Sequence, residues 1–312
     1  EPIVVPKHQS RGLSIERLVI SLYAKGMSVA DIESEMQEIY GINLSTSAIS
    51  IITNKVSQAA TEWQNRPLDS LYMIVWMDGI VFKVRENGKV INKTVYLCVG
   101  LNKEGLKEVL GMWIGKNESA AFWMGVLTDL KARGVEDILI TVTDNLNGFT
   151  ETIKSVFPAF TTQICVVHQI RNSCRYVVWK EKKEFTADLK NIYNAPTKEA
   201  AEMELDNFEQ KWGAKYPYAI RSWRNNWEEL TVFFDFPVEI RKIIYTTNLI
   251  ENLNGKIRKY TKNKLSFPND DALKKSVYLA INEIEKKWYQ PIWNWALIFN
   301  QFITIFENRI QV

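Results

Sequence analysis

Several features that define other classes of protein are scarce in this sequence. Only three cysteines and two histidines occur among 312 residues, and the cysteines lack the spacing of a disulfide framework. This scarcity predicts a reducing compartment. No apolar run reaches the roughly 18 residues that a membrane span needs, and no signal peptide precedes the first polar segment. We therefore expect a cytoplasmic protein with no membrane partner.

The excess of positive charge is also small. The chain has 39 Lys and Arg residues against 36 Asp and Glu residues, which leaves a formal charge of +3. Net charge alone therefore argues neither for nor against a nucleic-acid partner, and the distribution of the charges must decide. By contrast, 46% of the residues are hydrophobic and 11 are tryptophan. This is ample for a sizeable core in one large domain or a few smaller ones.

The first 66 residues have the pattern of three short helices. Segments 14–25, 29–40 and 46–56 carry apolar residues at helical spacing, and glycines separate them. The capping residues Ser28 and Ser45 stand before the second and third segments. The third segment turns five polar side chains outward: Ser47, Ser50, Thr53, Asn54 and Lys55. This pattern is typical of a DNA-binding helix-turn-helix, although a three-helix bundle that touches no DNA would share it.

The middle of the chain predicts a mixed sheet with helices on its faces. Strands are expected at 71–84, 94–100, 107–114, 137–142 and 162–167, the last ending at His168. A helix at 118–131 should turn Ala121, Phe122, Val126 and Leu130 inward, and another helix should span 147–156. Residues 171–216 are helical and highly charged, and Trp212, Trp223 and Trp227 predict a second, helix-only core. Two more helices follow, at 246–262 and 270–287, before a tryptophan-rich tail.

An acid interrupts or directly follows two of these apolar strands. Asp78 interrupts the apolar run of 71–84, and Asp144 follows the apolar strand 137–142. A buried, unpaired carboxylate is costly, so it is normally neutralised, paired or bound to a metal. Asp78 followed by Gly79 is also typical of a simple turn or of a bulge. If the two strands are neighbours, however, the acids lie close together and need a cation between them.

A third acid is expected for phosphodiester chemistry with Mg²⁺, which uses two ions roughly 3.5–4 Å apart held by carboxylates. Glu251 is the candidate, because the next turns of its helix are rich in Lys, Arg and Asn, as suits a phosphate backbone. A solvated helix with a salt-bridged Glu would have the same composition. Carboxylates without a Cys/His cluster favour Mg²⁺ or Mn²⁺ over zinc.

Four motifs in order carry a resemblance to a known family. They are WMDG at 76–79, VTDNLNGF at 142–149, CVVHQIRNS at 165–173 and TTNLIENLNGKIRK at 246–259. Together they resemble the Mutator-type DDE transposases of bacterial insertion sequences, over nearly the whole chain. The resemblance implies a ribonuclease H-like α/β fold with an all-helical insertion before the last acidic helix. It implies four parts: a helix-turn-helix region at 1–66, core at 67–168, insertion at 169–244 and core at 245–312.

The resemblance also implies the chemistry. Asp78, Asp144 and Glu251 would be the catalytic and metal-binding triad for Mg²⁺, with Mn²⁺ as a substitute. They would cleave transposon ends and transfer the strand to target DNA, in a nucleoid-associated protein that acts as a homodimer on DNA. The family usually has Gly where this chain has Asn145; Asn tolerates a left-handed backbone best among the other residues, so we expect the turn to persist. Because the chain begins with Glu1, and members usually carry a region ahead of it, we expect a piece of a longer protein.

The remaining candidates surround the triad. Cys165 and His168 match the C-x2-H signature of the family, and with Cys174 they offer three zinc ligands but no fourth, since the other histidine is His8. We favour His168 as a catalytic-site residue that contacts DNA or positions the scissile phosphate, with a structural role nearly as well supported. The residues expected to contact DNA are Ser47, Ser50, Asn54, Lys55, Arg171, Asn172, Asn254, Lys256, Arg258, Lys259 and Lys262. For Lys182, Lys183, Arg221 and Arg224 we favour a solvated helix face, and for Trp76 and Trp113 the core.

Two rival functions share most of these features. A domesticated protein of the same fold would bind DNA without catalysis, and Asn145 and a truncated chain agree mildly with that alternative. A ribonuclease H-like nuclease such as a junction resolvase would cleave by DNA structure and show no strand transfer. A metal-dependent nick at element ends, followed by strand transfer, separates the transposase from both.

Overall fold

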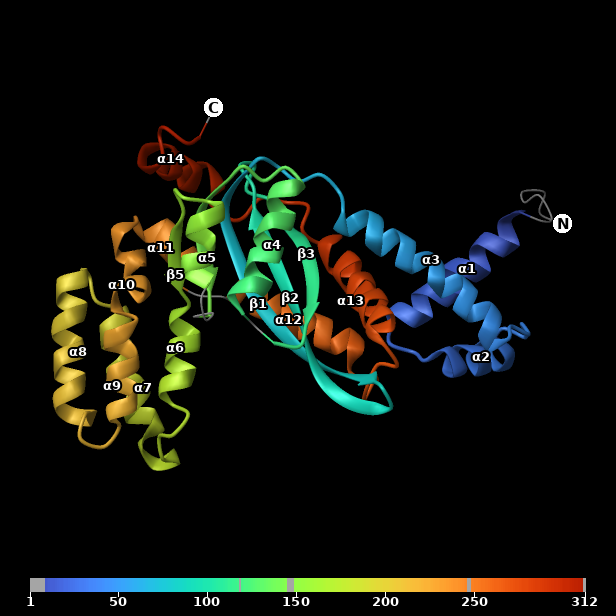
Figure 1. Cartoon of the computed structure of the whole chain (residues 1–312), viewed down its shortest axis with the longest axis horizontal. Helices are drawn as coiled ribbons and strands as arrows, with labels where there is room; N and C mark the ends of the chain where they lie inside the picture. Colours follow the sequence, from blue (N-terminus) through green and yellow to red (C-terminus); the bar gives the residue numbers. More distant parts are fainter. Residues whose placement is uncertain (1–8, 118, 145–148, 246–247, 311–312) are drawn as a thin grey trace.

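A five-stranded mixed sheet lies in the middle of the molecule in the computed structural model, which describes residues 9–117, 119–144, 149–245 and 248–310 (Figure 1). The strand order is β3-β2-β1-β4-β5. The first three strands are antiparallel neighbours, whereas β4 and β5 run parallel to β1. The expected mixed sheet is therefore confirmed. The bounds are β1 (Leu71–Glu86), β2 (Lys89–Leu101), β3 (Lys107–Gly115), β4 (Asp137–Thr143) and β5 (Thr161–Ile164).

The β1–β2 connection is a tight hairpin. Asn87 and Gly88 have φ angles of 50° and 78°, the left-handed backbone that a two-residue hairpin turn requires. Asn-Gly is the dipeptide that adopts it most readily, so the turn expected from the sequence is confirmed.

The fifth strand is shorter than expected. β5 ends at Ile164, and α6 (Val166–Ser173) begins almost at once, with Cys165 at its N-cap position. The prediction of a strand over 162–167 is therefore wrong at its end, and His168 lies on a helix rather than after a strand. A short apolar run cannot distinguish a strand from the start of a buried helix. The buried side chains of α6 are Val166, Gln169 and Ser173, which have helical spacing.

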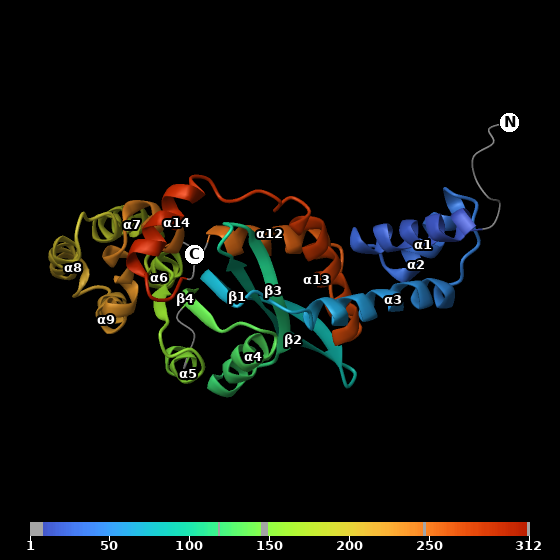
Figure 2. The same cartoon turned by 90° about the horizontal axis from the view of Figure 1, so that it is seen from above.

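Two pairs of helices cover the two faces of the sheet (Figure 2). On one face, α4 (Ala120–Ala132) and α5 (Phe149–Val156) pack over Val75 and Met77. On the other, α12 (Asn248–Thr261) and α13 (Asp270–Glu285) pack over the face that carries Trp76. Ala121 was expected on the inner face of α4 but is exposed; the buried stripe instead runs through Trp123, Val126, Leu127 and Leu130.

Helices alone fill the described part of the chain between β5 and α12. Figure 1 shows most of them as a separate-looking lobe at one end of the sheet. Trp212, Trp223 and Trp227 are buried there, as expected. Their core is not separate, however, because one cluster of buried side chains runs from these helices to the α12 face of the sheet. The elements are α7 (Trp179–Tyr193), α8 (Lys198–Trp212), α9 (Pro217–Asn225), α10 (Trp227–Leu230), the 3-10 helix η1 (Val232–Asp235) and α11 (Val238–Ile244).

The N-terminal helices lie at the opposite end of the molecule (Figure 1). They are α1 (Gln9–Ala24), α2 (Val29–Glu38) and α3 (Thr46–Gln64). The caps expected from the sequence are confirmed: Ser28 and Asp31 form a capping box, and Ser45 caps α3 with its side chain. Thr53 was expected to face outward but is buried, and its hydroxyl donates to the Ser50 carbonyl at 3.0 Å. The three helices share a small core that includes Leu279 of α13.

The two tryptophans assigned to the core differ in burial. Trp76 is fully buried and Trp113 is half-buried against the α4 face. The last element is α14 (Trp295–Ile305). Among the described helices, none combines the length and apolar composition needed to cross a bilayer.

Candidate active site

Asp78 lies within a continuous strand. β1 pairs with β2 through Asp78↔Leu97 and Gly79↔Tyr96 without a break, so the turn and bulge alternatives at Asp78 are wrong. Side chains alternate between the two faces of a strand; Asp78 therefore shares the face of Trp76 and points toward α12. Its side chain is buried, with 7% exposed.

Asp144 reaches the same point from the neighbouring strand. β4 is parallel to β1, with Trp76 opposite Val142. Two residues further along each strand, Asp78 and Asp144 are level. β4 ends at Thr143 whereas β1 continues, so Asp78 lies where β1 loses its neighbour on that side. This arrangement confirms that the two acid-bearing strands are neighbours. The expected turn at Asn145 lies outside the described residues.

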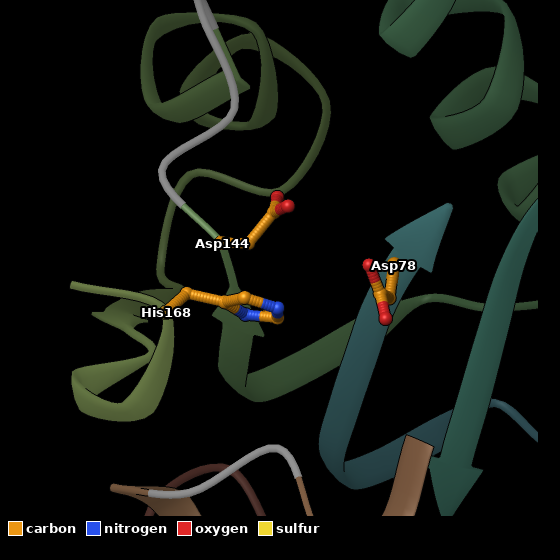
Figure 3. A group of neighbouring side chains, drawn as sticks. All are labelled: Asp78, Asp144 and His168. Atoms are coloured by element: carbon orange, nitrogen blue, oxygen red, sulfur yellow. The ribbon is translucent and has the colours of Figure 1, made fainter. Parts of the chain in front are cut away.

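His168 completes a cluster with the two aspartates. One ligand atom from each of Asp78, Asp144 and His168 lies within 4.8 Å of the others, and Figure 3 shows the three side chains converging from β1, the end of β4 and α6. The expectation that His168 lies near the acids is thus confirmed, while its role stays a prediction. Two carboxylates and an imidazole at this distance are a suitable donor set for a divalent cation.

Burial makes the two aspartates hard to ionise. It raises the pKa of Asp78, although the Gly79 N–H, which donates to Oδ1 at 2.7 Å, and the charge of His168 partly oppose the rise. Burial and then the negative charge of Asp78 raise the pKa of Asp144 to about 6. In addition, Asp144 Oδ1 is buried with no hydrogen-bond partner among the described residues. A cation between the carboxylates would relieve both costs.

The histidine has the opposite tendency. Burial lowers the pKa of His168, but its hydrogen bond with Cys165 and the charges of Asp144 and Asp78 outweigh this and raise it to about 9. The imidazole is therefore held as a cation in the absence of another positive charge. It partly neutralises the two acids of the cluster.

Glu251 lies beside this cluster, on the first turn of α12. Its carboxylate accepts two hydrogen bonds from the Arg171 guanidinium, at 2.6 and 2.9 Å, and His168 Nε2 is 3.7 Å from its Oε1. Its charge also contributes to the raised pKa of Asp78. The tight group of ligand atoms does not include Glu251, so its place as third metal ligand stays a prediction. Arg171, expected to contact phosphate, holds Glu251 in this structure.

Asn254 connects α12 to Asp78. It lies one turn after Glu251, is 8% exposed, and donates from Nδ2 to Asp78 Oδ2 at 2.5 Å. The DNA contact expected for Asn254 stays a prediction, but burial leaves little of the side chain accessible and its amide is bonded to Asp78. The i, i+3 spacing from Glu251, which places both residues on one helix face, was the signal that could have placed Asn254 at the site.

The cations expected on α12 are accessible. Lys256, Arg258, Lys259 and Lys262 are exposed, and the charge of Arg258 reaches Asp78. Asn172 on α6 is also exposed. Their DNA contacts stay predictions, and the accessible positive face of α12 agrees with them.

Of the α3 residues expected to contact DNA, Ser47 is exposed, whereas Lys55 and Asn54 already contact other side chains of the protein. Lys55 Nζ lies 2.7 Å from Glu16, and Asn54 accepts a hydrogen bond from Lys275 at 3.2 Å. The helix-turn-helix function stays a prediction, for which Ser47 offers the freest side chain.

The zinc alternative gains no support among the described residues. Cys165 is buried and Cys174 half-buried, both as free thiols, and neither belongs to the group of close metal-ligand atoms. His8 lies outside the described residues. In the insertion, Arg224 pairs with Asp206 and Glu209, which agrees with the solvated helix face favoured for it.

Comparisons with known proteins identify the family of the chain. The family model described as "Transposase, Mutator family" matches residues 1–291. The chain is 42% identical over 310 residues to the transposase for insertion sequence element ISRM3 of Rhizobium meliloti, which covers 99% of this chain and 78% of the relative. It is 31% identical over 291 residues to the transposase for IS905 of Lactococcus lactis, covering 93% and 74%. It is 26% identical over 294 residues to the transposase for IS256 in transposon Tn4001 of Staphylococcus aureus, covering 92% and 74%.

Proposed function

Because the chain belongs to the Mutator family of transposases, we propose that it cleaves DNA at the ends of an insertion sequence and joins the freed end to target DNA. The observation that best supports this is the meeting of Asp78, Asp144 and His168, whose ligand atoms lie within 4.8 Å of one another. Two carboxylates on adjacent parallel strands, beside a helix with an exposed cationic face, suit a phosphodiester substrate.

We propose a ribonuclease H-like fold for the core. The support is a five-stranded sheet in which three antiparallel strands are followed by two strands parallel to the first. The all-helical stretch before α12 agrees with the insertion expected from the family. The N-terminal helices would bind the terminal repeats, in a homodimer that holds two ends.

The cofactor in this proposal is Mg²⁺, with Mn²⁺ as a substitute. Asp78 and Asp144 would hold it, with Glu251 as the third ligand. Two observations support the fit: Asp144 Oδ1 is buried with no partner in the described part of the chain, and the pKa values of both aspartates are raised. When bound, such a cation polarises the phosphodiester and the attacking oxygen.

The protein's own residues have separate roles in this proposal. Gly79 N–H and the Asn254 amide orient the two oxygens of Asp78. Arg171 fixes Glu251 through its two terminal guanidinium nitrogens. His168, which lies beside the two acids, would position the scissile phosphate. Water would attack the phosphodiester in the first step, and the freed 3′-hydroxyl would attack the target strand in the second.

The test is a cleavage and joining assay with a duplex that carries the element's end. We expect Mg²⁺-dependent nicking and strand-transfer products from the wild type. Asp78→Asn, Asp144→Asn and Glu251→Gln should each abolish both while DNA binding persists. Nicking at the wild-type rate by one variant removes that residue from the triad.

The same assay separates the rival functions. DNA binding without any nick, with either Mg²⁺ or Mn²⁺, would indicate a domesticated binding protein. Cleavage of branched DNA without joining would indicate a resolvase.

A further inference from the structure

A groove rich in lysine lies where α1, α12 and α13 meet. It consists of two adjoining cavities of about 370 Å³ and 270 Å³, which share Lys25, Tyr260 and Glu283. The larger cavity also contains Lys256, Lys259 and Lys287 in its walls. We call the surface formed by Lys25, Lys256, Lys259 and Lys287 the lysine groove.

The positive charges of the lysine groove are not neutralised within the described part of the chain. None of its four lysines forms an ion pair with a described residue, and the acid in its wall, Glu283, is already bonded to Lys286. Some cations of the insertion, by contrast, are paired: Lys198, Lys211, Lys215 and Arg224 each contact an acid. The groove therefore gathers around one cavity four lysines that have no ion pair with a described residue.

A further lysine extends the groove toward the sheet. Lys107, at the start of β3, lies 5.5 Å above the Trp288 ring. Burial and then the charge of Lys256 lower its pKa, so these two cations are close enough to repel each other. An anion bound between them would relieve the repulsion.

The groove is rigidly attached to the helix that carries Glu251. Gly26, which follows α1, has a φ of +96°, and a Cβ there would lie 2.6 Å from the Tyr260 carbonyl oxygen on α12. Glycine thus allows the end of α1, with Lys25, to approach α12 closely. α13 packs on both helices (Figure 1), so the four lysines belong to one packed unit.

The groove also lies at a suitable distance from the active site for one DNA duplex. Lys256 and Lys259 follow Glu251 by five and eight residues, or about 7.5 and 12 Å along the helix at 1.5 Å per residue. At about 3.4 Å per nucleotide along the DNA axis, this is a few base pairs. Phosphates next to a cleaved bond would lie within reach of the groove.

We propose that the lysine groove, with Lys107, binds the sugar-phosphate backbone of the duplex that flanks the phosphodiester held at Asp78 and Asp144. This proposal rests on the proposed function and adds Lys25, Lys107 and Lys287 to its DNA contacts. The groove contributes affinity that is independent of sequence, because it contacts phosphates and not base edges.

The test is the salt dependence of DNA affinity, measured with a duplex of about 30 base pairs of arbitrary sequence, long enough to cover many phosphates. The variant is Lys25→Gln/Lys256→Gln/Lys287→Gln. The control, Lys89→Gln/Lys103→Gln/Lys190→Gln, loses the same charge at exposed lysines that form no ion pair with a described residue. Each lost phosphate contact reduces the slope of log K against log salt by about 1, so we expect a reduction of about 3 in the groove variant and none in the control.

Each outcome decides the proposal. An unchanged slope in the groove variant, or an equal reduction in the control, overturns it. Thermal unfolding checks that the triple variant is folded; if it is not, Lys287→Gln alone should reduce the slope by about 1, and no reduction overturns the proposal. If the wild type nicks element ends but the slope of the groove variant is unchanged, the groove proposal fails and the proposed function stands. If the slope falls in the groove variant but the wild type forms no nick, DNA binding by the groove stands and the proposed function fails.

Discussion

Removing the Asn254 carboxamide should weaken metal binding without unfolding the protein. Its Nδ2 donates to Asp78 Oδ2 at 2.5 Å, and both side chains are buried. Asn254→Ala removes this donor, so Asp78 loses one of the two hydrogen bonds that orient its carboxylate. The Gly79 N–H bond to the other oxygen remains. Asp78 should then be oriented less strictly toward Asp144.

The size of the effect can be worked from these contacts. A hydrogen bond to a charged group contributes about 1.5–3 kcal/mol, which corresponds to roughly 10- to 100-fold in affinity. Loss of a group that orients a metal ligand has a similar effect on metal binding, about 10- to 100-fold. The cost to folding should be smaller, because Asn254 Oδ1 is buried with no partner among the described residues. Removing that oxygen returns about 1–3 kcal/mol, so we expect the free energy of unfolding to change by only about 1 kcal/mol.

The assay is a calorimetric titration of the purified protein with Mn²⁺, together with urea unfolding. Asn254→Leu serves as a second variant that keeps the volume of the side chain and lacks the donor. Asn252→Ala is the matched control, since Asn252 is exposed on the same helix. We expect weaker Mn²⁺ binding in both Asn254 variants. The control should bind Mn²⁺ as tightly as the wild type. Mn²⁺ affinity within about threefold of the wild type, with a large loss of stability, would show that Asn254 is structural and refute the reasoning.

Three further predictions follow from single contacts. Arg171→Ala should slow nicking at least about tenfold, because Glu251 loses both hydrogen bonds from the guanidinium. The free energy of unfolding should change by less than about 1 kcal/mol, because the Arg171 side chain is exposed. An unchanged nicking rate would contradict this prediction. Burial lowers the pKa of Lys264 to about 8. Between about pH 8 and 10.4 the unfolded chain therefore binds more protons than the folded protein, and the free energy of unfolding rises with pH. Lys264→Met should lack this rise in urea unfolding, and a pH profile identical to that of the wild type would contradict the prediction. Trp123→Ala should cost about 3–5 kcal/mol in urea unfolding, because the ring is fully buried and contacts Phe149 at the start of α5; a loss below about 1 kcal/mol would contradict it.

The fold could be predicted where local signals agree with one another. The Asn87-Gly88 hairpin and the Ser28 cap each carry a residue pattern that is specific for one local structure. Prediction failed where the pattern was short. The apolar residues around Cys165 suit a strand and a buried helix start equally, and only packing against the rest of the chain decides between them.

The site could be predicted to the level of the two strands but not of the contacts. Asp78 and Asp144 were identifiable because an acid in an apolar strand is rare and costly. The partners of these residues come from distant segments. Arg171 reaches Glu251 from 80 residues away, and Asn254 reaches Asp78 from 176 residues away. The i, i+3 spacing of Glu251 and Asn254 places both on one helix face, but nothing in the sequence says which carboxylate that face meets.

The buried residues of α12 determine the directions in which its polar side chains point. Ile250, Leu253 and Ile257 are fully buried and fix the rotation of the helix against the sheet. With that rotation fixed, Glu251 and Asn254 share the side that meets Asp78. Lys259 and Lys256 lie about 80° and 140° round the helix from Glu251 at 3.6 residues per turn, and both open into the lysine groove. The hydrophobic stripe thus sets the direction of both polar stripes. A change at this stripe that rotated the helix would displace the carboxylate and the lysines together, so cleavage and salt-dependent binding should be lost in parallel, whereas changes on either polar stripe should separate them.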